Sequence, residues 1–476
     1  MWRPGSFLRD RIGWQAYLKP FLEKPLPGDL NWTFTLGSVC ALLFVVQAVT
    51  GIFLAAYYSP SPDHAYQAID YIMQDVFMGR ILRGIHHWGG GGMVVLVFFH
   101  MVTNFYYGAY KAPRELTWII GVGLLILTLG FGFTGYLLPW DQKAYWATVV
   151  GTSIPEDIPL VGQLITRLIR GGEEVSGLTL TRFYSTHILI LPAFMLLFMG
   201  FHIYLVRIHD IAGHWDPNHP GKEKTSPFFP DHLFKSAIAF AIVFSVVIAL
   251  ALFVDPPRED IAMTPDPSYL PRPDWYYMWL FQLLTYFSGK AEIIGSVAIP
   301  MGGVLLLIFL PFLSRTSLRS PADRPIATAV GVVFLMGIVY LTLMGLAGSK
   351  PYGKVVVVPD RQLTPAEIKG VKVWLARDCA YCHRIMGRGA PGPREGPDLS
   401  NVIEKDRTKD WLVKMIRDPK SISRWTSMPK YDLTEEELNA LAEFILSLDF
   451  KRHGLRIISR EEVLKGDMNL RQYLKR

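Results

Sequence analysis

The chain has 476 residues, of which half are hydrophobic and 19% are charged. This composition is too apolar for one soluble globule and indicates a protein with several membrane spans. The net charge of +7 is spread over the segments between apolar stretches, and no nucleic-acid-binding motif is present, so we exclude nucleic acid as a partner. Three cysteines are too few for a disulfide framework.

Residues 1–30 are polar and basic and lack the apolar core of a signal peptide, so we expect the first span to act as an uncleaved insertion signal. Seven apolar stretches follow, each long enough to cross a bilayer. They lie at about 33–57, 82–107, 116–138, 184–206, 234–254, 292–313 and 326–347.

Loop charge predicts the orientation of these spans. With the N-terminus inside, the inside segments hold thirteen Lys and Arg residues, whereas the longer outside segments hold nine. The positive-inside rule therefore favours a cytoplasmic N-terminus, and seven spans then place the C-terminus outside.

Two of the apolar stretches each contain a widely spaced histidine pair, His86 with His100 and His187 with His202. On a helix each pair spans about 21–22 Å, with both imidazoles within about 60° of one face. An imidazole in the apolar part of a membrane needs a partner. Both spans run from outside to inside, so His86 would meet His187 near the outer face and His100 would meet His202 near the inner face. This pattern predicts two bis-histidine haems, although each histidine alone could be a hydrogen-bonded core residue.

Four glycines repeat the fourteen-residue spacing, Gly37 and Gly51 in the first span and Gly121 and Gly135 in the third. A glycine lets a flat macrocycle approach the backbone, so we expect these spans to close the sides of two haem pockets. Helix packing through small residues is the alternative. Arg83 lies one turn before the first histidine, where it could meet a haem propionate or reach toward the membrane interface.

Two long segments, 139–183 and 255–291, are expected on the outer side. The second contains Pro273-Asp274-Trp275-Tyr276. A carboxylate beside aromatic side chains at the membrane edge could take a proton from a quinol, which makes Asp274 and Tyr276 candidate catalytic residues. From the residues alone, a helix-capping role for Asp274 is equally open.

After a linker at 348–365 the composition becomes that of a soluble domain. Cys379 and Cys382 with His383 form the motif that attaches a c-type haem, in which the histidine is the proximal ligand. A zinc site would need a second ligand pair, which is not found. We expect Met428 to be the distal ligand. Weaker candidates for that position are Met386 and Met415. Because bacteria attach this haem outside the cytoplasmic membrane, the motif also predicts an outside C-terminus.

With these motifs the sequence resembles a known family. Residues 1–213 are similar to cytochrome b6 and residues 227–347 to its partner subunit IV, and together they resemble a cytochrome b of the cytochrome bc1/b6f class. Residues 366–449 resemble a class I cytochrome c. Besides the histidines and glycines, the likeness rests on the segments 111–118, 135–141 and 181–184.

The resemblance implies an all-α fold, with about seven transmembrane helices, a four-helix haem-binding core and a small all-α cytochrome c domain. It divides the chain into a domain binding two b haems (1–213), a three-helix domain (214–347), the linker 348–365, a cytochrome c domain (366–449) and a basic tail (450–476).

The resemblance also implies a quinol–cytochrome c reductase in a bacterial cytoplasmic membrane. Quinol would be oxidised between the 139–183 and 255–291 segments, beside a separate Rieske iron–sulfur protein. One electron would pass through that protein and the covalent haem c to a cytochrome c or terminal oxidase. The other would cross the two b haems to an inner quinone site near Arg207, with coupled proton translocation. A homodimer within a larger complex is also implied.

The sequence departs from the family pattern at two places. Asp274 replaces the glutamate of the family motif Pro-Glu-Trp-Tyr and has a shorter reach. The b6-type members attach an extra haem to a cysteine where this chain has Thr35, so we expect no third membrane haem and a core position for Cys40. Two other functions remain open: a membrane electron wire that anchors another dehydrogenase, and a haem-containing sensor or assembly protein. The outer quinol motif favours the reductase.

Overall fold

The structure is a computed structural model. It describes residues 19–459 without 21, 29, 214–223, 260, 263–271, 288–290, 314–316, 348–354, 378, 380–381, 384, 386–398, 400–401, 403–406, 424–425, 427 and 449–453. The chain divides into two units, which are described separately. The first comprises Met1–Met263 and Val297–Met336, and the second comprises Thr264–Ser296 and Gly337–Arg476.

Seven helices within the described residues are long and apolar enough to cross a membrane. The prediction of about seven transmembrane helices is therefore confirmed, and the chain is a multi-pass membrane protein. The spans are Trp32–Ala55, Gly79–Tyr106, Glu115–Tyr136, Gly177–His209, Phe228–Phe253, Ile294–Leu313 and Pro325–Ala347.

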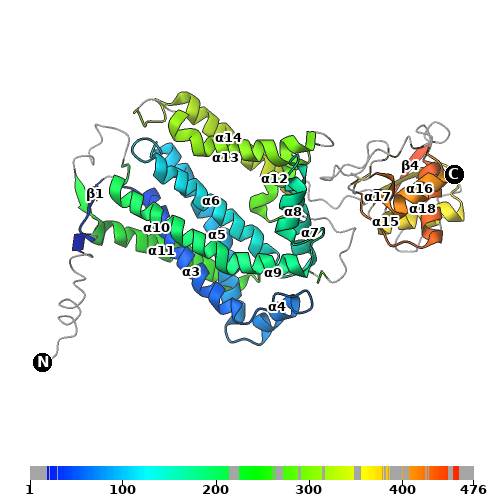
Figure 1. The fold of residues 1–476 in the computed structure, drawn as a ribbon, viewed down its shortest axis with the longest axis horizontal. Coiled ribbons are helices and arrows are strands. Elements are labelled where there is room, and N and C mark those ends of the chain that lie inside the picture. Colours follow the sequence, from blue (N-terminus) through cyan, green and yellow to red (C-terminus); the bar gives the residue numbers. More distant parts are fainter. Residues whose placement is uncertain are drawn as a thin grey trace. The chain divides into compact units, whose positions relative to one another are not determined.

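Four helices form the centre of the first unit (Figure 1). Helix α3 (Leu36–Ala55) packs against α5 (Gly79–Tyr106), which also packs against α6 (Glu115–Tyr136), and α6 packs against α10 (Leu191–His209). One apolar cluster fills the space between them. It contains Cys40, Leu43, Phe44, Met93 and Met195.

The remaining spans cover this centre. Helix α11 (Leu233–Phe253), preceded by the turn η4 (Phe228–His232), packs against α3 and α5. Helix α13 (Ile299–Leu313) packs against α6, where the indole of Trp118 donates a hydrogen bond to the Leu307 carbonyl at 2.7 Å. The last span is α14, Pro325–Ala347.

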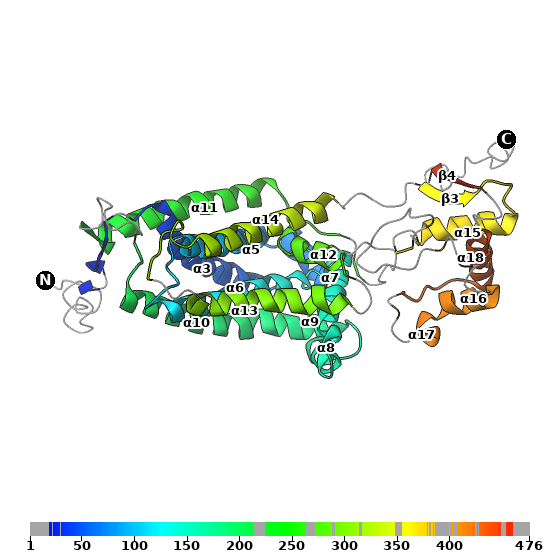
Figure 2. The same ribbon diagram turned by 90° about the horizontal axis from the view of Figure 1, so that it is seen from above.

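The two ends of the first unit differ in structure (Figures 1 and 2). At one end, called the α7 end, lie short helices, of which the last, α9, is the first part of the fourth span. They are α4 (Ala65–Gln74), α7 (Gln142–Ser153), η2 (Ile154–Asp157), α8 (Gly162–Arg170) and α9 (Gly177–Ser185). At the other end, called the β1 end, strand β1 (Pro25–Pro27) pairs antiparallel with β2 (Thr225–Pro227).

The second unit begins with the turn η5 (Trp275–Tyr277) and helix α12 (Met278–Leu284). Its C-terminal part is a small helical domain. The elements are β3 (Val355–Pro359), α15 (Pro365–Ala376), α16 (Lys409–Arg417), α17 (Pro419–Ile422), α18 (Glu435–Ser447) and β4 (Leu455–Ser459). Helices α15 and α18 cross closely at Gly370, since a Cβ atom there would lie 2.2 Å from the Ala440 carbonyl oxygen.

The all-α prediction is confirmed, with one addition in this domain. Strand β3 comes from the predicted linker and β4 from the predicted basic tail, and they pair antiparallel along their whole length. Val356, Val357 and Val358 are buried and belong to the same core as Trp374 and Phe444. The strand pair is therefore part of the domain core. The rest of the tail, beyond residue 459, lies outside the described residues.

Removal of β4 should destabilise this domain. We expect a chain that ends at residue 454 to show a lower thermal unfolding midpoint for the C-terminal domain, because the ladder that holds the buried valines of β3 is lost. A chain that ends at residue 459 is the matched control and should unfold like the full chain. Scanning calorimetry of the two purified proteins measures the difference, and equal midpoints would contradict the role of β4.

Candidate functional site

The four histidines of α5 and the fourth span form two opposed pairs. The ring centroids of His86 and His187 lie 6.3 Å apart, with an angle of 72° between the rings. Those of His100 and His202 lie 6.5 Å apart, with an angle of 76°. The first pair lies toward the α7 end and the second toward the β1 end, so the predicted partners are the ones that face each other.

These separations suit two imidazoles that bind one metal from opposite sides. With metal–nitrogen bonds of about 2 Å, and about 1 Å more from each nitrogen to its ring centre, the two centroids would lie about 6 Å apart. Direct ring packing would not require the same separation at both ends of the bundle. The geometry therefore fits a bis-histidine haem in each pair.

A wide turn explains why the two spans have different histidine spacings. The His187–His202 spacing is one residue longer than the His86–His100 spacing. In a regular helix, that residue would rotate the second ring by about 100° from the direction that the fourteen-residue spacing gives. The fourth span contains a π-type turn, Thr186–Ile190, which holds one residue more than an α-helical turn. Pro192 follows it, and its ring would clash with the Ile188 carbonyl in a regular helix. The wide turn relieves this clash and absorbs the extra residue.

Each histidine ring lies against one of the four predicted glycines. A Cβ atom on Gly37 would lie 3.0 Å from Cε1 of His100, and one on Gly51 would lie 3.1 Å from Cε1 of His86. The corresponding distances are 3.3 Å between Gly121 and His202 and 2.7 Å between Gly135 and His187. A larger side chain at these positions would push the rings out of place. These four close contacts with the rings fit the predicted haem pockets better than general helix packing does.

The two histidines near the α7 end share a further contact. The hydroxyls of Thr50 and Thr134 lie 3.0 Å from Nδ1 of His86 and of His187, respectively. Each hydroxyl donates its hydrogen to the carbonyl four residues earlier in its own helix. With its hydrogen used in this way, the hydroxyl can accept from Nδ1–H, and in that tautomer Nε2 has the lone pair that a metal would need.

Arg83 is 8% exposed and lies one turn before the first histidine. Within the described residues its guanidinium makes one hydrogen bond, to the sulfur of Met73 at 3.4 Å, and no ion pair. Asp70, Asp141 and Asp255 act on this guanidinium only from beyond contact distance. A buried guanidinium that touches no carboxylate is costly, so a haem propionate would complete this site. This burial argues against an arginine that merely reaches toward the interface.

Arg207 lies at the β1 end, in the last turn of α10. Its guanidinium carbon lies 5.9 Å from the ring centroid of Phe228. The Lys24 ammonium contacts the Arg207 carbonyl and forms an ion pair with Asp210 at 2.5 Å. A cationic side chain and an aromatic ring thus lie together where the sequence predicts a quinone site.

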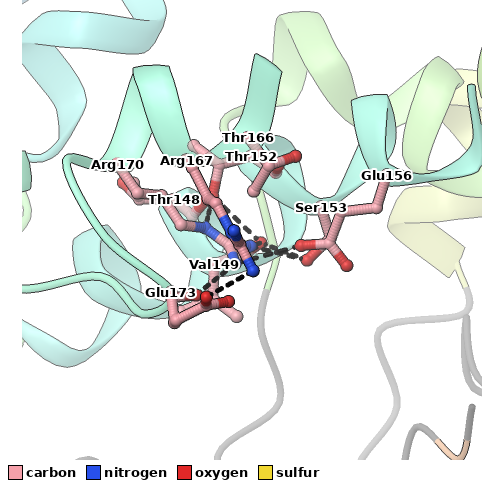
Figure 3. Close-up of polar contacts among 9 residues, drawn as sticks. All are labelled: Thr148, Val149, Thr152, Ser153, Glu156, Thr166, Arg167, Arg170 and Glu173. Carbon is pink, nitrogen blue, oxygen red and sulfur yellow. Dashed lines mark hydrogen bonds and ion pairs between the residues drawn. The ribbon is translucent and has the colours of Figure 1, made fainter. Parts of the chain in front are cut away.

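A buried arginine holds the short helices of the α7 end together (Figure 3). The guanidinium of Arg170 on α8 donates to the hydroxyls of Thr152 and Ser153 at 2.7 and 2.8 Å and to the Val149 carbonyl at 3.1 Å. It also forms an ion pair with Glu156 at 3.0 Å. These bonds fix α8 to α7 and η2.

The first residues of the 255–291 segment bind to the same end. Asp141 caps α7 by accepting from the Ala144 amide at 2.8 Å, and its second oxygen accepts from the Glu259 amide at 3.1 Å. Arg258 forms an ion pair with Asp70 on α4 at 2.5 Å. The two long loops expected to border a quinol site are therefore in contact.

Asp274 and Tyr276 lie in the second unit. The turn η5 begins after Asp274, but the aspartate side chain makes no capping hydrogen bond. The Tyr276 hydroxyl donates to Oδ2 of Asp274 at 3.4 Å. Burial, together with Asp274 and Tyr277 beside it, raises the pKa of Tyr276 well above its usual range, so this phenol stays protonated. The carboxylate thus has a neutral hydrogen-bond donor at its side.

The c-type motif lies against the core of the C-terminal domain. The amides of Cys382 and His383 both donate to the Cys379 carbonyl, at 3.3 and 3.0 Å, which forms a tight turn. The His383 ring lies 6.4 Å from that of the buried Trp374. Cys379 and Met428 are both partly buried against the same apolar cluster. The attachment motif Cys379–His383 and the proposed distal ligand Met428 thus lie beside the same domain core.

The remaining predicted residues are Met386, Met415 and Cys40. Met386 lies outside the described residues, and Met415 lies on α16. Cys40 is 8% exposed and packs in the apolar centre of the bundle, which is the position expected of a core residue.

Sequence reasoning missed Thr50, Thr134 and Arg170. The two threonines could have been noticed, because each stands directly before a pocket glycine, whereas Leu36 and Ile120 precede the other two glycines. Arg170 has no such pattern, and only the fold shows that it is buried.

Comparisons with known proteins agree with this geometry. The family model described as cytochrome b/b6/petB matches residues 21–210, and that described as cytochrome b(C-terminal)/b6/petD matches residues 260–359. The cytochrome c model matches residues 367–449.

Individual proteins similar to this chain match about two thirds of it or less than half. The chain is 36% identical to the cytochrome bc complex cytochrome b subunit of Chlorobaculum thiosulfatiphilum, over 67% of this chain and 74% of that protein. It is 32% identical to cytochrome b of Rickettsia conorii, over 71% of this chain and 84% of that protein. It is 41% identical to cytochrome b6 of Heliobacterium modesticaldum, over 44% of this chain and 98% of that protein.

A solved structure described as a hyperthermophilic respiratory Complex III matches with a TM-score of 0.64 and 28% identity, covering 72% of this chain and 91% of that one. Matches to both halves of cytochrome b and to cytochrome c account for most of the chain. The chain therefore belongs to the cytochrome b family of bc-type complexes, as a haem-binding subunit of a quinol–cytochrome c reductase-type oxidoreductase that joins b6-like and subunit IV-like parts to a C-terminal cytochrome c domain.

Proposed function

We propose that this chain oxidises quinol at its α7 end and divides the two electrons between a Rieske iron–sulfur partner and the b haems. The α7 end would face the outside of a bacterial cytoplasmic membrane, as the loop charges predict. The C-terminal cytochrome c domain would lie on that side and pass electrons to a cytochrome c or terminal oxidase. A homodimer within a larger complex is the expected assembly.

The observation that supports this function most is the repeated histidine geometry. Two opposed imidazole pairs have nearly equal separations, and a glycine faces each of the four rings. Two b haems held in this way would form a path for electrons between the two ends of the bundle. His86 and His187 would bind the outer haem, and His100 and His202 the inner one.

The residues around the pairs have separate roles in this proposal. Arg83 would bind a propionate of the outer haem, and the cationic group at Arg207 would bind quinone at the inner site. Cys379 and Cys382 would hold the haem c vinyl groups, and His383 and Met428 would be its axial ligands.

Asp274 would take a proton released by the quinol. The carboxylate is an acceptor, and the protonated phenol of Tyr276 stabilises it and orients it by a hydrogen bond. The contacts around Arg170 and Asp141 hold together the segments of the α7 end. Quinol oxidation outside and quinone reduction inside would couple electron transfer to proton translocation.

Haem content tests the proposed electron path. The purified chain should contain two b haems for each c haem in a pyridine haemochrome spectrum. The substitution His100→Ala should lower this to one b haem for each c haem and leave the outer haem in place. A ratio of one b to one c in the unmodified protein would contradict the paired ligands, and two covalent haems would contradict the core assignment of Cys40.

The pocket glycines give a sterically matched test. Gly135→Ala would place a methyl group 2.7 Å from Cε1 of His187, so we expect loss or a shifted spectrum of the outer b haem. Gly130→Ala on the same helix meets only Leu191 methyl groups at 3.7–3.8 Å and should keep both b haems. Redox difference spectra measure the effect. Two unaltered b haems in Gly135→Ala would mean that this glycine is not part of a haem pocket.

The proton acceptor can be tested by turnover. Asp274→Ala should slow quinol oxidation by roughly tenfold or more, because the proton loses its acceptor. Asp274→Glu restores the family's glutamate and should keep the turnover close to normal. Steady-state reduction of cytochrome c by the purified complex measures both variants, with b and c haem contents as the check on folding. Normal turnover of Asp274→Ala would rule out the proposed role.

A further inference from the structure

The two histidine pairs have different hydrogen-bond surroundings. Near the α7 end, Thr50 and Thr134 are 4% and 8% exposed, and their hydroxyls lie 3.0 Å from the histidine Nδ1 atoms. The two threonines come from different spans, α3 and α6, and each contacts one histidine of the pair. The same arrangement thus occurs twice around one pair.

The pair near the β1 end lacks these hydroxyls. Leu36 and Ile120 occupy the positions before its glycines. Nδ1 of His202 is buried and meets no hydroxyl. Its ring interacts with the backbone carbonyl of Thr117, just as the rings of His86 and His187 interact with those of Gln47 and Phe131, so the threonine hydroxyls are the feature that only the first pair has. At His100 the neighbouring group is the amide nitrogen of Asn104, which lies 3.4 Å from both ring nitrogens and donates to the His100 carbonyl at 2.7 Å. An amide nitrogen offers a donor, so it does not replace an acceptor for Nδ1–H.

The hydrogen bonds at the α7 end have a fixed direction. Each threonine uses its only hydrogen on a backbone carbonyl, at 2.8 Å in both cases, so its oxygen accepts from the histidine. An acceptor at Nδ1–H makes the imidazole a stronger donor to a metal at Nε2 and fixes the ring orientation. For a haem ligand, a stronger donor favours ferric iron and lowers the reduction potential.

We propose that Thr50 and Thr134 are positioning residues of the outer b haem: they fix the ligating tautomer of His86 and His187 and lower the potential of that haem. This inference rests on the proposed function only in assuming that both histidine pairs bind b haems. The inner haem has no such pair of hydroxyls, so the two hydrogen bonds give the two haems different surroundings within one symmetrical set of ligands.

The test is a redox titration of the b haems in Thr50→Val, Thr134→Val and the double variant. Valine keeps the side-chain volume and removes the acceptor. We expect the outer haem to titrate at a higher potential in each single variant, with a larger shift in the double variant, while the inner haem stays unchanged. The outer haem is identified as the b absorption band that remains in His202→Ala.

Two controls separate this effect from a packing defect. Thr128→Val removes a buried hydroxyl on α6 that bonds only to the Leu124 carbonyl, at 2.8 Å, and should leave both potentials unchanged. Thr50→Ser and Thr134→Ser keep the acceptor and should restore the normal outer potential.

Each result has a defined meaning. Loss of the outer haem alone, with the inner haem retained, would also support the positioning role, because the hydroxyls would then be needed to hold its ligands. An unchanged outer potential in the double variant would overturn the inference, as would equal shifts of both haems or the same shift in Thr128→Val. A chain with two b haems and unshifted potentials would leave the proposed function intact and refute this inference alone.

Discussion

The structure depends on one physical constraint: an imidazole inside an apolar bundle must have a polar or metal partner. Two spans supply four such imidazoles, and the chain satisfies them in pairs. The rings of each pair stand more than 6 Å apart, too far for a direct hydrogen bond between them. The positions of α3 and α6 follow from this, because each must bring small residues against the rings. The four-helix centre is therefore arranged around two opposed histidine pairs, whose separations suit a metal between the rings.

The backbone of the fourth span is irregular at the point where it positions His187 opposite His86. His187 lies in a wide π-type turn, and Pro192 makes a regular turn unfavourable at the same place. A fifteen-residue spacing thus gives the same pairing as a fourteen-residue spacing. Gly51 and Gly135 then each lie against one ring of the first pair. The π-type turn in the fourth span thus allows both histidine pairs to have nearly the same separation.

The sequence was sufficient for the spans, for which histidine rings face each other and for the four glycines that lie against those rings, because each follows from a repeated spacing on a helix. It was not sufficient for features that depend on residues distant in the chain. The pairing of β3 with β4 joins segments that the sequence suggests are a linker and a tail, since valines in a short run can be exposed or buried. The burial of Arg170 depends on how α8 folds back onto α7, which no spacing encodes. The long loops at the α7 end were recognised as important, but not the bonds that join them.

The same distinction explains why the threonines escaped notice. A threonine in a membrane helix ordinarily bonds to its own backbone, as Thr50 and Thr134 do. When each helix is considered alone, this bond already accounts for the hydrogen-bonding needs of the hydroxyl. Because a hydroxyl oxygen can donate and accept at once, the same residue also serves a ring on the neighbouring helix. The backbone bond in fact decides the direction of the second bond, since it uses the only hydrogen. In the proposed arrangement, a local interaction within each helix thus determines which nitrogen of a histidine on another helix remains available to a metal.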